Sequence, residues 1–322
     1  MVVELDRQAA TQPLTPVEDL LGDISPIDAG YYRVKEVAVH ATGLRLPGHM
    51  GLTDDGLLLV SEFGGGQVRD ITEPGDYTDP AKGRWAWNLR HPGGILPLSD
   101  GRIIVAASGS GEVYDITESG AATTSSLLFA DVPHPYGLVE FRNRIFASWS
   151  SDRMVGLVEI VPGERFESEE ASFVHGFPVV LTSEPYRELE GCGGSWTTPV
   201  KDDDLYLGHS ALGALFKVTP GGSFDDLRGE RYAWGLNLPL GMIADPLDGN
   251  IYVTERMTGV IKRIPHRGGY CCFAEPFLAG FQDPNCIRFT GVHIPVTFLT
   301  DRRDVGGGGD GCAETGPDRP DR

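Results

Sequence analysis

The fold is decided by two matching stretches, LPGHMGLTDDGLLLVSEFGGGQVRDIT at residues 46–72 and HPGGILPLSDGRIIVAASGSGEVYDIT at residues 91–117. They align without a gap at an offset of 45 residues. Each stretch reads as a short apolar strand, an Asp-Gly turn, a second apolar strand, a Gly-rich turn and a third strand. The unit of this chain is therefore predicted to be a meander of antiparallel strands.

The four residues that open these stretches form a lead-in that recurs along the chain. Further copies are HPYG at 134–137, LPLG at 238–241, DPNC at 283–286 and a degenerate CGGS at 192–195. A period of about 40 to 50 residues with several strands per unit is typical of a β-propeller. We therefore predict an all-β, six-bladed β-propeller, in which residues 167–194 of the longer third unit form a loop or lid over one face.

The two ends of the chain are predicted to meet in the last blade, because an unpaired sheet edge invites aggregation. YYRVKEVAVHATG at residues 31–43 alternates well and is assigned as the outer strand of that blade. The Gly- and Asp-rich residues after Asp304 cannot bury an apolar face, so the blade is predicted to lack a strand. The expected division is a flexible segment at 1–30, the propeller at 31–303 and a disordered tail at 304–322.

Composition excludes several classes of partner. The formal charge of −19 repels nucleic acid and anionic membrane surfaces, and no apolar run is long enough to span a membrane. We expect no leader sequence, because residues 1–23 have neither a basic start nor an apolar core, and the sequence contains neither a CxxC pair nor a nucleotide-binding GxxxxGK[ST] motif. We expect a cytoplasmic monomer that acts on a small molecule and uses no nucleotide cofactor.

One unit carries a family resemblance. PLGMIADPLDGNIYVTERMTGVIKRI at residues 239–264 resembles the NHL-repeat and SMP-30-gluconolactonase-like six-bladed propellers, and the likeness extends over roughly residues 46–301. The resemblance implies one of three functions: a metal-dependent lactonase-like hydrolase, a cyclase or lyase of the strictosidine synthase-like type, or a propeller that only binds partners. The lactonases hold a divalent metal with Glu, Asn and Asp side chains from different blades. Here only DPN at 283–285 approaches their P-N-G motif.

Aligned blades place equivalent residues side by side around the ring, so alignment predicts proximity. The third lead-in position is occupied by Gly48, Gly93, Tyr136, Gly194, Leu240 and Asn285. The glycines leave room for a small-molecule pocket bounded by Tyr136 and Asn285. Alternatively, the glycines serve tight turns and the tyrosine packs on a neighbour.

A second ring lies at the ends of the second strands, and it is rich in ionisable residues: Glu62, Ala107, Trp149, His209, Glu255 and Asp301. Such a group can bind a divalent cation through oxygen and nitrogen ligands, or can supply a general acid and base. The alternative is that the carboxylates cap turns or pair with arginines such as Arg256 and Arg302.

The leading functional prediction is a lactonase-like, metal-assisted hydrolase, in which a divalent cation such as Ca²⁺ polarises a carbonyl group. The predicted metal ligands are Glu62, Asn285 and Asp301, and the predicted catalytic residues are Glu62, His209, Glu255 and His49. The predicted substrate-binding residues are Tyr136, Trp149, Asn285 and Trp196. The alternatives are a metal-free cyclase, lyase or isomerase in the same cavity, and a scaffold without catalytic activity.

Overall fold

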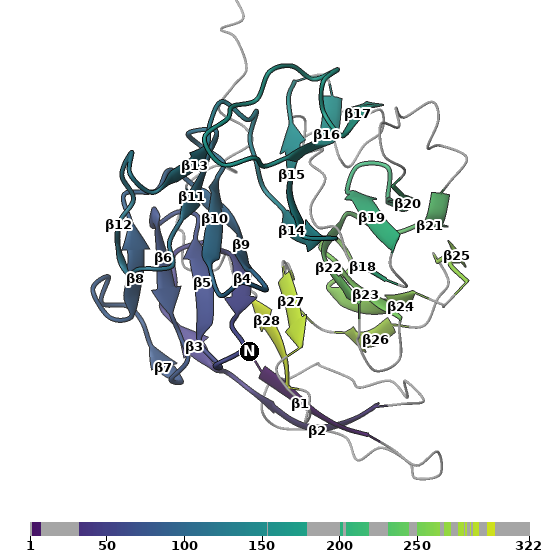
Figure 1. Cartoon of the computed structure of the whole chain (residues 1–322). Helices are drawn as coiled ribbons and strands as arrows, with labels where there is room; N and C mark the ends of the chain where they lie inside the picture. The colour runs from purple at the N-terminus through teal and green to yellow at the C-terminus, as the bar shows by residue number, and fades with distance from the viewer. Residues whose placement is uncertain are drawn as a thin grey trace, which may run out of the picture.

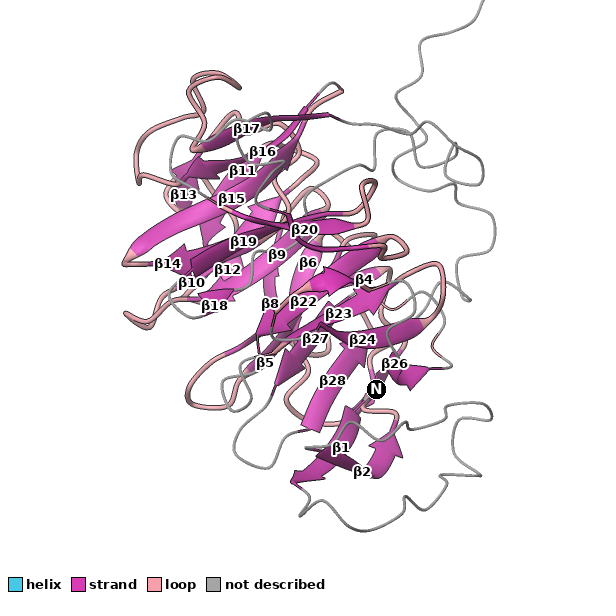
Figure 2. Cartoon of the chain, turned by 90° about the vertical axis from the view of Figure 1, so that its right-hand side faces the viewer, coloured by secondary structure: helices cyan, strands magenta, loops and turns pink. Residues whose placement is uncertain are grey.

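The fold is all-β: every regular element of the described chain is a strand (Figures 1 and 2). The computed structural model describes residues 2–7, 32–152, 154–178, 200–201, 204–218, 231–244, 250–264, 267–271, 276–279, 281, 284, 286–289 and 295–299. Within these residues, no helix is long and apolar enough to cross a membrane.

Five blades are built from strands that follow one another along the chain, as the repeat predicts. Each is an antiparallel meander whose first strand lies near the middle of the ring in Figure 1. The blades comprise β4 (Pro47–Leu52), β5 (Leu58–Glu62), β6 (Gln67–Asp70) and β8 (Arg84–Trp87); β9 (Pro92–Pro97), β10 (Ile103–Ala107), β11 (Glu112–Asp115) and β13 (Leu127–Phe129); β14 (Leu138–Phe141), β15 (Arg144–Ser150), β16 (Met154–Glu159) and β17 (Val174–Pro178); β18 (Val200–Lys201), β19 (Asp204–His209), β20 (Ala214–Lys217) and β21 (Arg231–Trp234); and β22 (Pro239–Ala244), β23 (Ile251–Glu255), β24 (Val260–Ile264) and β26 (Pro276–Ala279).

Strand β17 corrects one prediction. The sequence assigned residues 167–194 to a loop or lid, but Val174–Pro178 pairs with β16 as the fourth strand of the third blade. Residues 179–194 lie outside the described residues.

The remaining strands form a sheet in the order β2-β1-β28-β27, which joins the two ends of the chain. Its members are β1 (Val2–Arg7), β2 (Tyr32–Ala38), β27 (Cys286–Phe289) and β28 (Pro295–Leu299). The outer strand is β2, as predicted, but β1 fills the place that was predicted to lack a strand. The structure thus shows five blades of consecutive strands where the sequence predicts six, and this sheet of mixed origin stands beside them.

The core lies between neighbouring blades rather than within any one of them. Strands β5, β10 and β23 are buried along their whole length because adjacent blades cover both of their faces, which explains why each begins with three consecutive apolar residues. One hydrophobic cluster, for example, joins Leu59 and Val68 of the first blade to Ile95 and Val105 of the second.

Two short motifs fix the turns of the repeat. In DIT at 70–72, the Asp70 carboxylate accepts hydrogen bonds from the backbone N–H and the hydroxyl group of Thr72, and that hydroxyl accepts one from Leu58 N–H. DIT at 115–117 repeats these contacts. The motif therefore ties the end of the third strand to the start of the second.

The tips between second and third strands need glycine. Four equivalent glycines have positive φ angles of 57° to 76°, and the carbonyl oxygen of each accepts a hydrogen bond from an N–H group shortly after the fourth strand: Gly66, Gly111, Gly213 and Gly259. An added Cβ atom at Gly259 would lie 2.1 Å from the Phe281 carbonyl oxygen. Both the φ angle and this close approach exclude a larger residue.

Short parallel pairings, which we call clasps, connect successive blades at the outer rim. In each clasp, residues between the third and fourth strands of one blade pair with the outer strand of the preceding unit or with residues just after it. The clasps are β3 (Ala41–Thr42) with β7 (Gly75–Asp76), β8 with β12 (Gly120–Ala121), β21 with β25 (Gly269–Tyr270), and the single bridge from Ala130 to Arg165. The first of them ties the mixed sheet to the first blade. Strand β27 also contacts β22 and β4.

Candidate functional site

The first strands begin on one face of the ring, which we call the lead-in face. On this face, the lead-ins of the first, second and fifth blades each lie beside the tip of their own blade. The hydrogen bond from Phe63 N–H to the Leu46 carbonyl oxygen (3.0 Å) has counterparts from Ser108 to His91 and from Arg256 to Leu238. The lead-ins and tips of successive blades therefore share one surface, as the alignment predicted.

Tyr136 lies at the centre of the described lead-ins. A Cβ atom added to Gly93 would lie 3.1 Å from its ring, and one added to Gly48 would lie 3.2 Å from its hydroxyl oxygen. The Tyr136 carbonyl oxygen accepts a hydrogen bond from Gly94 N–H at 2.8 Å. The tyrosine of the third blade thus reaches across the second blade to the first, and it takes up part of the room that the glycines leave.

Tyr136 is partly exposed as a residue, and three blades contribute to the surroundings of its side chain. Burial raises the pKa of its phenol above the ordinary value of 10.0, the Cys286 thiol adds to the rise, and the charge of Arg256 acts in the opposite direction. Arg256 belongs to the fifth blade and Cys286 to the mixed sheet. The phenol is therefore neutral at physiological pH and can donate a hydrogen bond or a proton.

The tyrosine predicts an alkaline limit to stability. Because its folded pKa lies above the unfolded value, its contribution is fully present below about pH 10 and is lost as the pH rises further. The free energy of unfolding should fall by up to about 1.4 kcal/mol per pH unit for this one proton. Urea unfolding between pH 8 and pH 11 should show a shallower fall for Tyr136→Phe, and equal slopes would contradict the assignment.

His49 is buried, with 1% of its surface exposed. Its Nδ1 atom accepts a hydrogen bond of 3.3 Å from Ile95 N–H of the second blade, which assigns a ring proton to Nε2. This predicted catalytic histidine therefore joins the first strands of two blades.

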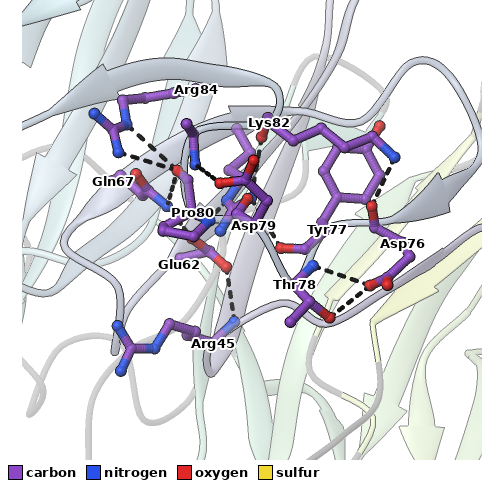
Figure 3. A network of polar contacts seen from close by, with 12 residues as sticks. Arg45, Glu62, Gln67, Asp76, Tyr77, Thr78, Asp79, Pro80, Lys82 and Arg84 are labelled. Atoms are coloured by element: carbon purple, nitrogen blue, oxygen red, sulfur yellow. Dashed lines mark hydrogen bonds and ion pairs between the residues drawn. The ribbon is translucent and has the colours of Figure 1, made fainter.

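Glu62 belongs to a buried network in the first blade (Figure 3). Its Oε1 accepts a hydrogen bond from Arg45 N–H at 2.7 Å, and its Oε2 accepts bonds from Gln67 (2.5 Å) and Arg69 (2.7 Å). The Arg69 guanidinium also donates to the carbonyl oxygens of Tyr77, Asp79 and Lys82, so it holds the loop between β6 and β8. With both oxygens engaged by donors, Glu62 does not fit the role of a metal ligand.

Glu255 repeats this arrangement in the fifth blade. Its Oε1 accepts a hydrogen bond from Asn237 N–H at 3.0 Å and pairs with Lys262 at 3.0 Å, and its Oε2 accepts a bond from Thr258. The geometry favours the alternative interpretation of the sequence, in which these carboxylates pair with cations. The cations are Arg69 and Lys262 rather than Arg256. The sequence pattern that could have predicted these pairs is a basic residue seven positions after each glutamate, on an otherwise buried third strand.

Trp149 and His209 point between blades. Trp149 packs in a cluster with Leu138 and Phe129, and its ring nitrogen has no hydrogen-bond partner among the described residues. The His209 ring is fully buried and lies 6.0 Å from the Phe177 ring of the preceding blade. These positions correspond to Glu62 and Glu255 in the repeat, but Trp149 and His209 contact the neighbouring blade, whereas the two glutamates pair within their own blades.

Three predicted site residues, Asn285, Asp301 and Trp196, lie outside the described residues. Within the described part of the chain, no group of three or more His, Cys, Asp or Glu residues could hold a metal ion. Of the three predicted metal ligands, Glu62 therefore does not fit that role, and Asn285 and Asp301 stay predictions.

No protein-family model matches the chain, and no curated protein matches it in sequence. Solved structures do match. A gluconolactonase from Xanthomonas campestris is 11% identical with a TM-score of 0.52, and the match covers 80% of this chain and 87% of that one. A luciferin-regenerating enzyme is 12% identical with a TM-score of 0.50, covering 77% and 81% of the two chains. Virginiamycin B lyase from Staphylococcus aureus is 16% identical with a TM-score of 0.47, covering 78% and 76%.

Identities this low show a common fold and nothing about activity. The chain therefore has the β-propeller fold that its resemblance to the NHL-repeat and gluconolactonase-like propellers predicts.

Proposed function

We propose that this propeller is an enzyme that hydrolyses a small ester or lactone at the lead-in face, with Tyr136 as the proton donor. The observation that carries the proposal is the position of the Tyr136 hydroxyl group: it is neutral at physiological pH and lies where lead-ins of several blades converge, on a residue that is partly exposed. General acids of this kind accelerate a reaction by about 10²-fold or more.

The proposed reaction is balanced without any further reagent. The oxygen of a water molecule bonds to the acyl carbon, and the bond from that carbon to the leaving oxygen breaks. The leaving oxygen takes the Tyr136 proton, and the proton of the added water returns to the phenolate. The products are a carboxylic acid and an alcohol, or one hydroxy acid when the substrate is a lactone.

A divalent ion does not enter this proposal, because Glu62 does not fit the role of a ligand. Binding of such an ion at Asn285 and Asp301 remains a separate proposal. Elemental analysis of the purified protein and its activity after chelation test it: a stoichiometric ion whose removal abolishes turnover would restore the metal-assisted reading.

Substitution of Tyr136 tests the enzyme. Acid release from a panel of γ- and δ-lactones and simple esters should identify a substrate, and Tyr136→Phe should lower its kcat by about 100-fold. The control is Tyr270→Phe, which removes the same group from a side chain that is 56% exposed in the outer clasp β25. The control should keep the wild-type rate, and both variants should melt within a few degrees of wild type.

Two results would contradict the proposal. A Tyr136→Phe variant with the wild-type rate would remove the tyrosine from the chemistry. Cleavage without incorporation of oxygen from labelled water would indicate a lyase in place of a hydrolase. If no member of the panel is cleaved, the result favours the alternative that the protein is a binding scaffold without catalytic activity.

We further propose that the sheet β2-β1-β28-β27 serves as the sixth blade. Its strand β27 contacts the first strands of the first and fifth blades, β4 and β22, as a blade between them would. We also propose that the protein is cytoplasmic and monomeric; the buried free thiols of Cys271 and Cys286 support the cytoplasmic location. A thiol titration of the denatured protein tests whether the cysteines are reduced, and light scattering tests whether the protein is a monomer.

A further inference from the structure

We infer that the small molecule bound at the lead-in face carries an oxyanion, either a carboxylate or a phosphate. This inference rests on the proposed function and names the class of its substrate. It is argued from the charges of the lead-ins and tips, in a chain whose formal charge is −19.

The charged side chains of this face are mainly basic. Among the described lead-ins, the residues just before them and the tips, the basic residues apart from the buried His49 are Arg45, Arg90, Arg256, His91 and His134. The exposed acidic residue in the same segments is Asp152. Arg45 and Arg90 are exposed and form no ion pair with any residue in the described ranges. Figure 3 shows the Arg45 side chain extending away from Glu62.

The two carboxylates nearest to this face do not cancel its charge. Glu62 and Glu255 are completely buried, and each is already paired with a cation of its own blade, Arg69 and Lys262 respectively. The positive charge of the exposed arginines is therefore left to act on whatever approaches the face.

Among the described residues, the opposite end of the blades carries both signs. In its turns between first and second strands, the exposed Asp54 and Asp55 lie in the first blade, Asp100 pairs with Arg102 in the second, and the exposed Arg142 lies in the third. The excess of basic side chains therefore belongs to the lead-in face, and such a field concentrates an anionic ligand there.

The basic charge extends to the proposed site itself. Arg256 follows strand β23 directly, and its charge acts on the Tyr136 hydroxyl group. Guanidinium groups bind carboxylate and phosphate oxygens through paired hydrogen bonds, which gives geometric as well as electrostatic preference. A ligand that places its oxyanion toward the arginines would bring its neutral, cleavable end to the tyrosine.

Two matched pairs of probes test the inference: gluconate against glucitol, and glucose 6-phosphate against glucose. Each pair differs chiefly in the presence of the anionic group, and the two pairs distinguish carboxylate from phosphate. Thermal unfolding at low ionic strength should show stabilisation by at least one anion and none by its neutral partner. The stabilisation should disappear in 0.5 M NaCl because salt screens exposed charges.

Variants connect the binding to this face. Arg45→Gln, Arg90→Gln and Arg256→Gln should each weaken the anion by about tenfold, the value of one charge-assisted hydrogen bond. Arg142→Gln is the matched control, because it removes the same charge from an exposed turn at the opposite end. The control should bind like wild type.

The outcomes separate this inference from the proposed enzyme. If neither anion binds more tightly than its neutral partner, or if Arg142→Gln weakens binding as much as the other variants, the inference is overturned, even when Tyr136→Phe still abolishes lactone turnover. If the anion binds as described while Tyr136→Phe leaves turnover unchanged, the anion site stands and the proposed catalytic role fails.

Discussion

Replacement of Arg69 with alanine is expected to lower the free energy of unfolding by about 3 to 5 kcal/mol. The variant leaves the Glu62 carboxylate buried without its cation, and a buried uncompensated charge is among the most destabilising changes that a protein can suffer. It also removes the donor for three carbonyl oxygens of the loop between β6 and β8. Urea unfolding followed by tryptophan fluorescence measures the difference.

Two further variants separate the buried charge from charge in general. Arg102→Ala removes an arginine whose pairing with Asp100 is solvent-exposed, so it should change stability by about 0.5 kcal/mol or less. Lys262→Met breaks the equivalent buried pair of the fifth blade and should be costly too, since Glu255 would keep only its neutral donors. Equal stability of Arg69→Ala and Arg102→Ala would show that the buried network does not hold the first blade.

Replacement of Gly259 with alanine is expected to destabilise the protein by about 2 to 4 kcal/mol, because it combines two penalties. A φ angle of 64° is unfavourable for a residue with a Cβ atom, and the new atom would lie 2.1 Å from the carbonyl oxygen of Phe281. The tip and the exit of the fourth strand would have to separate, which breaks their hydrogen bond of 3.0 Å. Thermal and urea unfolding report the loss.

Gly101→Ala provides the matched control for the second penalty. Gly101 has a φ angle of 88°, but no atom lies within 4 Å of the added Cβ position. This variant should therefore show the conformational cost alone, about 1 kcal/mol. If both glycine variants lose the same stability, the close approach at the tip is not what requires glycine there.

The repeat carried most of the fold prediction because its signals are local. Asp-Gly turns, apolar second strands and Gly-rich tips are read directly from neighbouring residues. The structure places the apolar runs as strands β5, β10 and β23, with the Asp-Gly turns before β5 and β10. Strand β1 could not be predicted in this way. Its first three residues pair with β28, almost the whole length of the chain away, and nothing in VVELDR specifies that partner.

The alignment predicted which positions of the blades are equivalent, but it did not predict the direction in which each side chain points. Ser61 and Thr254 occupy equivalent positions, and each hydroxyl group accepts a hydrogen bond from the N–H of its own lead-in, as the alignment implies. One residue further on, Glu62 turns into its own blade, whereas Trp149 packs between two blades. The direction depends on the volume and charge of residues on the neighbouring blade, which the alignment of one strand does not contain.

The clasps at the outer rim have a consequence for how such a molecule diverges. Their pairings are made by backbone atoms, so they place little demand on which side chains a blade carries. A blade can therefore accept substitutions at its lead-in and still be fastened to its neighbour. Because the clasps at the rim hold the blades together, the lead-in residues can change without loss of the architecture. The same scaffold can therefore come to bind unrelated substrates through substitutions at its lead-ins alone.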